Sequence, residues 1–144
     1  MKRLVIAAAL VAVSITTAFA GPIEDRQALM KNIAATTKTA VGYAKGTTPF
    51  DAAKVKVLLQ VYVDSAAKLP TLFPDDSKTG GTDPTTASPK IWEDMAGFKA
   101  HAAKLSADAT AAMAATDQAS FAKAFGVIAS NCNSCHGDYR TKKD

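Results

Sequence analysis

Two cysteines and a histidine near the C-terminus form the most informative pattern in the sequence. Cys132, Cys135 and His136 stand in the order C-x-x-C-H, which is the attachment signature of haem c. On a helix the two thiols lie three residues apart on one face, where they can add to the two vinyl groups of one haem edge. The imidazole of the next residue then projects a ring nitrogen toward the iron. We therefore predict one covalently bound haem c on Cys132 and Cys135, with His136 as an axial iron ligand.

Three other uses of paired cysteines fit this sequence less well. A thioredoxin-like pair lies at the N-terminus of a helix that follows a strand, whereas Cys132 falls near the C-terminal end of the last predicted helix. A zinc site needs four ligands, and the other histidine, His101, is a single polar residue that we expect to face solvent. A disulfide between cysteines three residues apart on a helix has poor geometry. Haem attachment is therefore the preferred interpretation.

The N-terminus has the pattern of an export signal. Met1 to Arg3 are positively charged, Leu4 to Val13 are apolar, and Ala18-Phe19-Ala20 matches the A-x-A cleavage site. The apolar run is shorter than the ~20 residues that a membrane-spanning helix needs, although a retained anchor is the alternative. We expect residues 1–20 to be a signal peptide and residues 21–144 to form a single domain with no membrane span. Export of this kind predicts a periplasmic protein.

The charge of the chain excludes one class of partner. The 144 residues include 17 Lys and Arg against 13 Asp and Glu, for a net charge of +4. Two of the basic residues, Lys2 and Arg3, belong to the predicted leader, so the remainder has 15 basic against 13 acidic residues, or +2. The basic residues are scattered singly and form no patch with interleaved aromatic residues. We therefore expect no nucleic-acid partner.

The elements that must position the haem ligands are helices. Apolar residues recur at spacings of three and four along the chain, which indicates amphipathic helices and no strands. Pro22, Asp51, Ser88 and Asp117 open four predicted helices over about residues 22–45, 51–69, 88–115 and 117–142. We predict an all-α fold, an antiparallel four-helix bundle. The turn-rich residues 70–89 form one long loop between helices 2 and 3, which we expect to cross over the bundle.

Two methionines could reach the second axial position of the iron. In an up-down-up-down bundle the first helix begins and the fourth helix ends at the same end. At ~1.5 Å per residue, Met30 lies about 12 Å from the start of its helix and His136 about 9 Å from the end of its own, so they are nearly level. Met95 passes the same test at about 10 Å from its helix start, whereas Met113 lies too far along. A methionine in an apolar stripe usually packs in the core, so spacing alone leaves both candidates open.

The flanks of the haem motif resemble a known family. The C-terminal pattern from Cys132 to Arg140, C-x-x-C-H-x-x-Y-R, is similar to that of the class II c-type cytochromes, the cytochrome c′ superfamily. Further stretches that fit are Arg26 to Lys31, Pro49 to Ala52, Leu69 to Pro74 and Pro89 to Trp92. The resemblance covers essentially the whole chain after the leader. It implies a four-helix bundle that carries one haem c.

The resemblance also distinguishes the two methionines. High-spin members of the family carry an apolar residue such as leucine at one position of helix one, and low-spin members, the cytochrome c-556 group, have a methionine ligand there. Met30 matches that position, which implies axial ligation by His136 and Met30 and leaves Met95 as core packing. The implied function is electron transfer between redox donor and acceptor proteins, without enzyme activity. The alternative is a five-coordinate cytochrome c′ that binds nitric oxide or carbon monoxide, and a homodimer stays open in either case.

Three further residues have expected roles. Arg26 lies one turn before Met30 and either pairs with a haem propionate or is exposed, and the sequence leaves both open. Arg140 lies one turn after His136, where the family's arginine flanks the histidine ligand. Trp92 is expected to be a hydrophobic anchor at the start of helix three.

Overall fold

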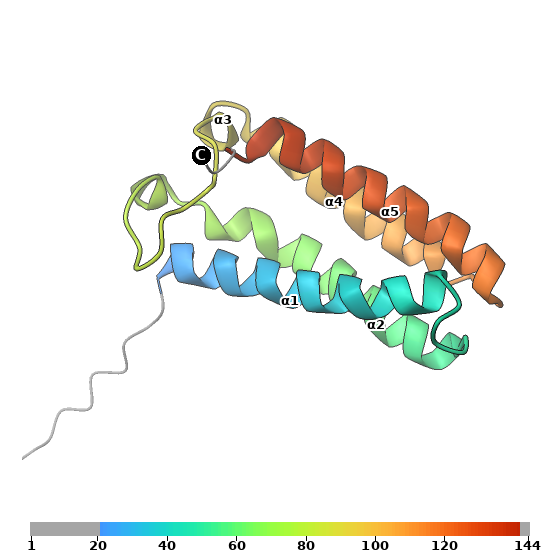
Figure 1. Cartoon of the computed structure of the whole chain (residues 1–144). Coiled ribbons are helices and arrows are strands. Elements are labelled where there is room, and N and C mark those ends of the chain that lie inside the picture. The colour runs from blue at the N-terminus through green and yellow to red at the C-terminus, as the bar shows by residue number, and fades with distance from the viewer. Residues whose placement is uncertain (1–20, 142–144) are drawn as a thin grey trace, which may run out of the picture.

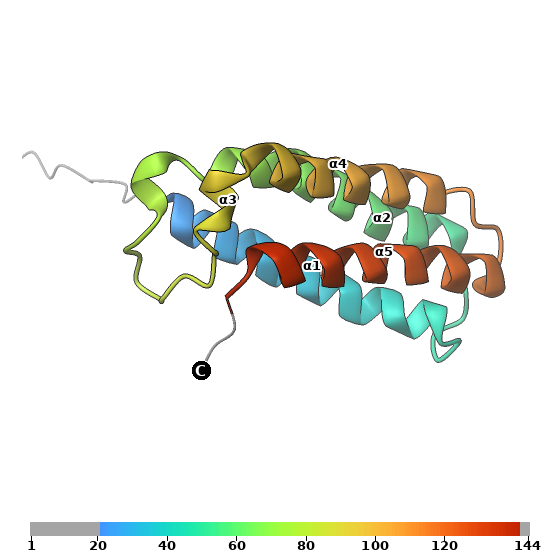
Figure 2. The ribbon, with the colours of Figure 1, turned by 90° about the horizontal axis from the view of Figure 1, so that it is seen from above.

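A computed structural model describes residues 21–141, and the predicted signal peptide at residues 1–20 lies outside them. Four long helices make up most of this part, α1 at Pro22–Ala44, α2 at Ala52–Lys68, α4 at Met95–Ala112 and α5 at Gln118–Tyr139. They run side by side in alternating directions (Figures 1 and 2). Residues 21–141 contain no β-strand. The predicted all-α, antiparallel four-helix bundle is confirmed.

Aspartates open α2 and α5, as the sequence predicts. The Asp51 carboxylate accepts hydrogen bonds from the backbone N–H groups of Ala53 and Lys54, both at 3.0 Å. Asp117 accepts from the N–H of Ser120 at 2.8 Å, and the Ser120 side chain bonds back to the N–H of Asp117. These bonds satisfy N–H groups that have no partner inside a helix.

The predicted third helix is divided in two, which corrects the expectation of one continuous helix over 88–115. A single turn, α3 at Lys90–Glu93, ends before Asp94, and α4 begins at Met95. The backbone of Asp94 is not helical (φ −131°, ψ 58°), and its side chain accepts a hydrogen bond from the N–H of Gly97 at 2.9 Å. Asp94 therefore interrupts the helix and caps the segment that follows.

The long connection between α2 and α4 covers the end of the bundle where α1 begins and α5 ends (Figure 1). It contains two 3₁₀ turns, Leu69–Leu72 and Asp75–Ser77. Near its end Ala87 forms an isolated antiparallel bridge with Arg140. Arg140 is extended (φ −121°, ψ 129°), so α5 ends at Tyr139, earlier than predicted. The loop crosses over one end of the bundle, as expected.

A buried arginine on α1 holds this loop in place. Arg26 is only 4% exposed. Its Nη1 donates to the Leu72 carbonyl at 3.3 Å and to Ser77 Oγ at 3.0 Å, and its Nη2 donates to the Ser77 carbonyl at 2.8 Å and to Thr85 Oγ1 at 3.0 Å. The guanidinium carbon lies 4.7 Å from the centre of the Phe73 ring, within cation–π range. These contacts offset the cost of burying the charge.

The buried side chains form two clusters rather than one continuous core. The first lies toward the α1–α2 turn and includes Ala40, Tyr43, Val55, Leu59, Phe121, Phe125 and Ile128. The second lies toward the long loop and consists of Leu69, Leu72, Phe73, Ile91, Phe98 and Tyr139. Met30 packs against both clusters, Cys132 packs against the first, and Cys135 packs against the second. The predicted site residues therefore lie where the two clusters meet.

The aspartate caps predict a loss of stability in acid. Backbone N–H bonds hold the pKa of Asp51 and of Asp117 below the ordinary value. A depressed pKa in the folded state stabilises the protein above the unfolded-state pKa of about 4, and this stabilisation disappears as the pH falls through the folded-state pKa. We expect the midpoint temperature of thermal unfolding, measured by circular dichroism, to decrease as the pH is lowered from about 5 to about 3, the range in which carboxyl groups titrate. The Asp51→Asn, Asp117→Asn double variant keeps two capping side chains without their titration and should fall less. An equal fall in both proteins would contradict this assignment.

The Arg26 contacts predict that this residue controls access to the long loop. Replacing Arg26 with methionine leaves several loop acceptors without their donor, which should cost about 1–3 kcal/mol of stability. Trypsin should then cleave after Lys78, inside the loop, faster than in the unaltered protein. The matched control is Lys38→Met, which removes an exposed cation from the same helix. Equal cleavage rates in the two variants would show that Arg26 does not hold the loop.

Candidate functional site

The last turns of α5 bring the two cysteines and the histidine to one cavity. Cys132, Cys135 and His136 all line a cavity of about 620 Å³ between α5 and α1, a size suited to a bound cofactor. Both cysteines are half-buried and carry free thiols. His136 is the most exposed of the three. The spacing of the motif therefore places the two thiols and the imidazole on one wall, as the sequence predicts.

The rest of the cavity wall is mainly apolar. It is formed by α1 and α5, by single residues of α2, α3 and α4, and by both ends of the long loop. The apolar lining residues are Ile33, Ala34, Leu69, Phe73, Ala87, Ile91, Phe98, Phe125, Ile128 and Ala129. Cations stand on the same wall, namely Arg26, Lys31 and Arg140. An apolar interior with cations at its edge suits a flat hydrophobic group that carries carboxylates.

The two methionine candidates lie in different places. Met30 on α1 lines the cavity together with His136. Met95 is not among the residues that form this wall, and it packs against the cluster that contains Ile91 and Phe98. Of the two thioethers, only that of Met30 borders the same space as the thiols and the imidazole.

Burial sets the protonation of the site. It raises the pKa of the Cys132 thiol, and it raises that of Cys135 to about 11, with Cys132 and Asp138 adding to the effect. Such thiols stay protonated at neutral pH, unlike the low-pKa cysteines of redox catalysts. Burial, followed by the charge of Arg140, lowers the pKa of His136. A neutral imidazole keeps a lone pair free for a metal.

The structure excludes one of the two roles that the sequence left open for Arg26, and the pairing with a haem propionate stays a prediction. The alternative of an exposed side chain is wrong, because Arg26 is buried against the loop. All four terminal N–H positions of its guanidinium have acceptors in the loop, although the residue also lines the cavity. Trp92 is half-buried and its Nε1 donates to the carbonyls of Phe73 and Pro74 at 3.1 and 3.2 Å. This agrees with its predicted role as an anchor.

A polar pair in the cavity wall was not foreseen. The Thr37 hydroxyl donates to the Ile33 carbonyl at 2.8 Å. The fully buried Tyr62 hydroxyl, 2.9 Å from Thr37 Oγ1, therefore acts as the donor in that contact. Burial raises the pKa of Tyr62. The only sequence signal was the presence of one threonine and one tyrosine in otherwise apolar stripes.

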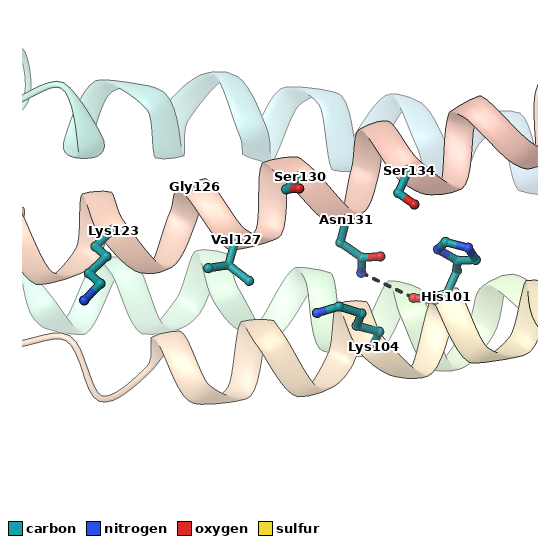
Figure 3. A pocket seen from close by; sticks show the side chains of 8 residues that line it. All are labelled: His101, Lys104, Lys123, Gly126, Val127, Ser130, Asn131 and Ser134. Carbon is teal, nitrogen blue, oxygen red and sulfur yellow. Dashed lines mark hydrogen bonds between the residues drawn. The ribbon is translucent and has the colours of Figure 1, made fainter.

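A second hollow, of about 450 Å³, lies between α4 and α5 (Figure 3). Asn131, which is 5% exposed, donates from Nδ2 to the His101 carbonyl at 3.4 Å, and its Oδ1 has no partner among the described residues. His101 is half-buried here instead of facing solvent as expected, because its ring packs against Tyr139 and its Nε2 lies 3.4 Å from Asp138. This hollow is lined by lysines and small residues and presents no thiol or thioether. It is chemically unlike the cavity that carries the haem motif.

The donor set of the main cavity fits a covalently attached haem. Two protonated thiols stand at the spacing of haem c attachment, a neutral imidazole follows them, and a thioether borders the same space. Helices among residues 21–141 are all too short or too polar to cross a membrane.

Comparisons with known proteins agree with this chemistry. A family model described as cytochrome C′ matches residues 21–140. Cytochrome c′ of Rhodopseudomonas palustris (strain ATCC BAA-98 / CGA009) is 47% identical over 122 residues, which cover 84% of this chain and 82% of that relative. Cytochrome c-556 of Agrobacterium fabrum (strain C58 / ATCC 33970) is 41% identical over 126 residues, covering 86% and 84%. A solved structure of cytochrome c′ from Rhodopseudomonas palustris matches with a TM-score of 0.79 and 46% identity, covering 85% of this chain and 98% of that one. The chain thus belongs to the cytochrome c′ family, whose members carry covalently attached haem c.

Proposed function

We propose that this protein is an electron-transfer cytochrome whose haem iron is held between His136 and Met30. The observation that supports this most strongly is that Met30, on α1, and His136, on α5, border one cavity together with both cysteines. A histidine and a methionine together are the axial pair of haem proteins that carry electrons. No catalytic residue is assigned, because a haem held by both His136 and Met30 would have no axial position left for a substrate.

Each group in the cavity has one task in this function. The haem supplies a reversible one-electron change at its iron. Cys132 and Cys135 fix the haem to α5 by thioether bonds, and His136 offers the lone pair of a neutral imidazole. The apolar wall excludes water from the iron, which is one of the ways a protein sets a haem potential. The exposed Arg140 and Lys31 provide positive charge for the haem carboxylates.

A five-coordinate cytochrome c′ that binds nitric oxide or carbon monoxide is the second candidate function. It is favoured by the name of the relative from Rhodopseudomonas palustris, cytochrome c′, whereas the Agrobacterium relative is a cytochrome c-556. The two functions differ in whether a side chain occupies the sixth position of the iron. The thioether of Met30 in the cavity wall favours the electron carrier.

Replacing Met30 tests the axial ligand. In the haem-loaded protein, Met30→Ala should convert a low-spin spectrum with sharp bands in the reduced state to a high-spin spectrum, because the iron loses a ligand. The weak ferric absorption band of thioether-bound iron should disappear completely. Met95→Ala is the matched control and should keep both features, since Met95 packs outside the cavity wall.

The gas-binding candidate makes the opposite prediction for the unaltered protein. A broad high-spin spectrum that changes readily on addition of carbon monoxide, and that Met30→Ala leaves as it was, would overturn the electron-carrier proposal in favour of gas binding.

We also propose that residues 1–20 are removed on export and that the protein works in the periplasm. The intact mass of the exported protein should then equal residues 21–144 plus one haem, and denaturation should not release the haem, because thioether bonds survive unfolding. The Cys132→Ser, Cys135→Ser double variant should lose the haem mass on denaturation. A mass that retains residues 1–20 would contradict cleavage, and a haem-free mass of the unaltered chain would contradict attachment.

A further inference from the structure

A short side-chain hydrogen bond connects the last turn of α5 to the residue that caps α4. The hydroxyl of Tyr139 donates to Asp94 Oδ2 at 2.7 Å. The other oxygen of the same carboxylate, Oδ1, accepts from the N–H of Gly97 at 2.9 Å. Tyr139 is 5% exposed. One carboxylate therefore holds both the N-terminus of α4 and the C-terminus of α5.

The surroundings of Tyr139 restrict it to this arrangement. The rings of Phe98 and His101 stand edge-on to the Tyr139 ring, with centroids at 5.4 and 5.6 Å. Lys90 Nζ lies over the same ring, 5.3 Å from its centroid. A methyl group at Gly97 would collide with both Asp94 Oδ2 and the Tyr139 hydroxyl oxygen, so only glycine permits the approach.

His136 depends on this turn of the helix for its position. It lies one turn before Tyr139 at the end of α5, and terminal helical turns fray unless something holds them. None of the side-chain hydrogen bonds found among the described residues involves its imidazole. Backbone bonds from Ser88 N–H to the Tyr139 carbonyl at 3.0 Å and from Thr141 N–H to the Thr86 carbonyl at 2.9 Å tie the chain to the loop. The Tyr139 hydroxyl ties this turn to the start of α4, and Asp138 of the same turn lies 3.4 Å from His101 Nε2 further along α4.

We propose that Tyr139 is a positioning residue for His136, because its hydrogen bond to Asp94 fixes the last turn of α5 and so the direction from which the imidazole meets the iron. The proposal rests on the assigned role of His136 as an iron ligand. It gives the tyrosine of the C-x-x-C-H-x-x-Y segment a task distinct from haem attachment.

The protonation of the pair is consistent with a bond that persists at neutral pH. The carboxylate raises the pKa of Tyr139 to about 12, and the phenol is the main cause that lowers the pKa of Asp94. A neutral phenol therefore donates to an ionised carboxylate, and bonds with one charged partner are about twice as strong as those between neutral groups.

The experiment measures the iron–imidazole bond directly. Ferrous holoprotein with Met30→Ala has an iron that only His136 is expected to ligate, and resonance Raman spectroscopy reports the iron–histidine stretching band. In that background Tyr139→Phe should shift the band to lower frequency and broaden it, since the ring stays packed but the hydroxyl is lost. Tyr43→Phe is the matched control, because Tyr43 is a 6% exposed tyrosine on α1 with no side-chain hydrogen bond among the described residues. It should leave the band unchanged.

A second variant separates positioning from stability. Gly97→Ala should reproduce the Raman shift, because the new methyl forces Asp94 and Tyr139 apart, while it favours the helix locally since alanine is the better helix former. If Tyr139→Phe and Gly97→Ala both leave the band as in Tyr43→Phe, the hydrogen bond is only structural and the proposal is overturned. Failure of the proposed function looks different, because a protein in which Met30 is not a ligand would already be five-coordinate in the ferrous state and would show the iron–histidine band before Met30 is replaced.

Discussion

The whole arrangement depends on the 3.6-residue period of one helix, α5. That period puts two thiols and an imidazole on one wall of a cavity. The remaining elements must supply the other walls. The first helix forms the facing wall, α2 and α4 contribute the buried rings of Tyr62 and Phe98, and the long loop closes one end. Because this cavity lies between the helices, the buried side chains do not merge into one core. They separate instead into two clusters that meet at Met30.

Closure of the loop end relies on polar contacts as well as on the apolar packing of the second cluster. Arg26 binds acceptors from two parts of the loop, and the Asp94 carboxylate joins α4 to α5. Both groups act at element ends, where backbone polar atoms would otherwise lack partners. The same end of the bundle carries His136. The polar contacts that complete the fold therefore lie at the same end of the bundle as the proposed iron ligand.

Sequence patterns predicted the features that depend on one element at a time. The caps at Asp51 and Asp117, the helical spacing of Cys132, Cys135 and His136, and the long loop all follow from local rules. The break at Asp94 does not, because an aspartate within a helical run is ordinary until a tyrosine from the last helix bonds to it. Arg26 was ambiguous for the same reason, since its acceptors lie on the loop and not on its own helix. The distance of each methionine along its helix could not show which of Met30 and Met95 faces the cavity, because tertiary packing sets the rotation of each helix about its axis.

The cavity joins the first and last long helices of the chain, which has a consequence for the order of folding. Contacts between distant segments form late, because closing a longer loop of unfolded chain costs more entropy. If haem is attached to α5 as proposed, His101 is nearer to it along the sequence than Met30 is, so an unfolded chain closes a shorter loop when His101 approaches the iron. Packing of α4 against α5 buries one side of the His101 imidazole against Tyr139. Packing of α4 against α5 would therefore hold this second histidine away from such a haem, whichever residue of the first helix faces it.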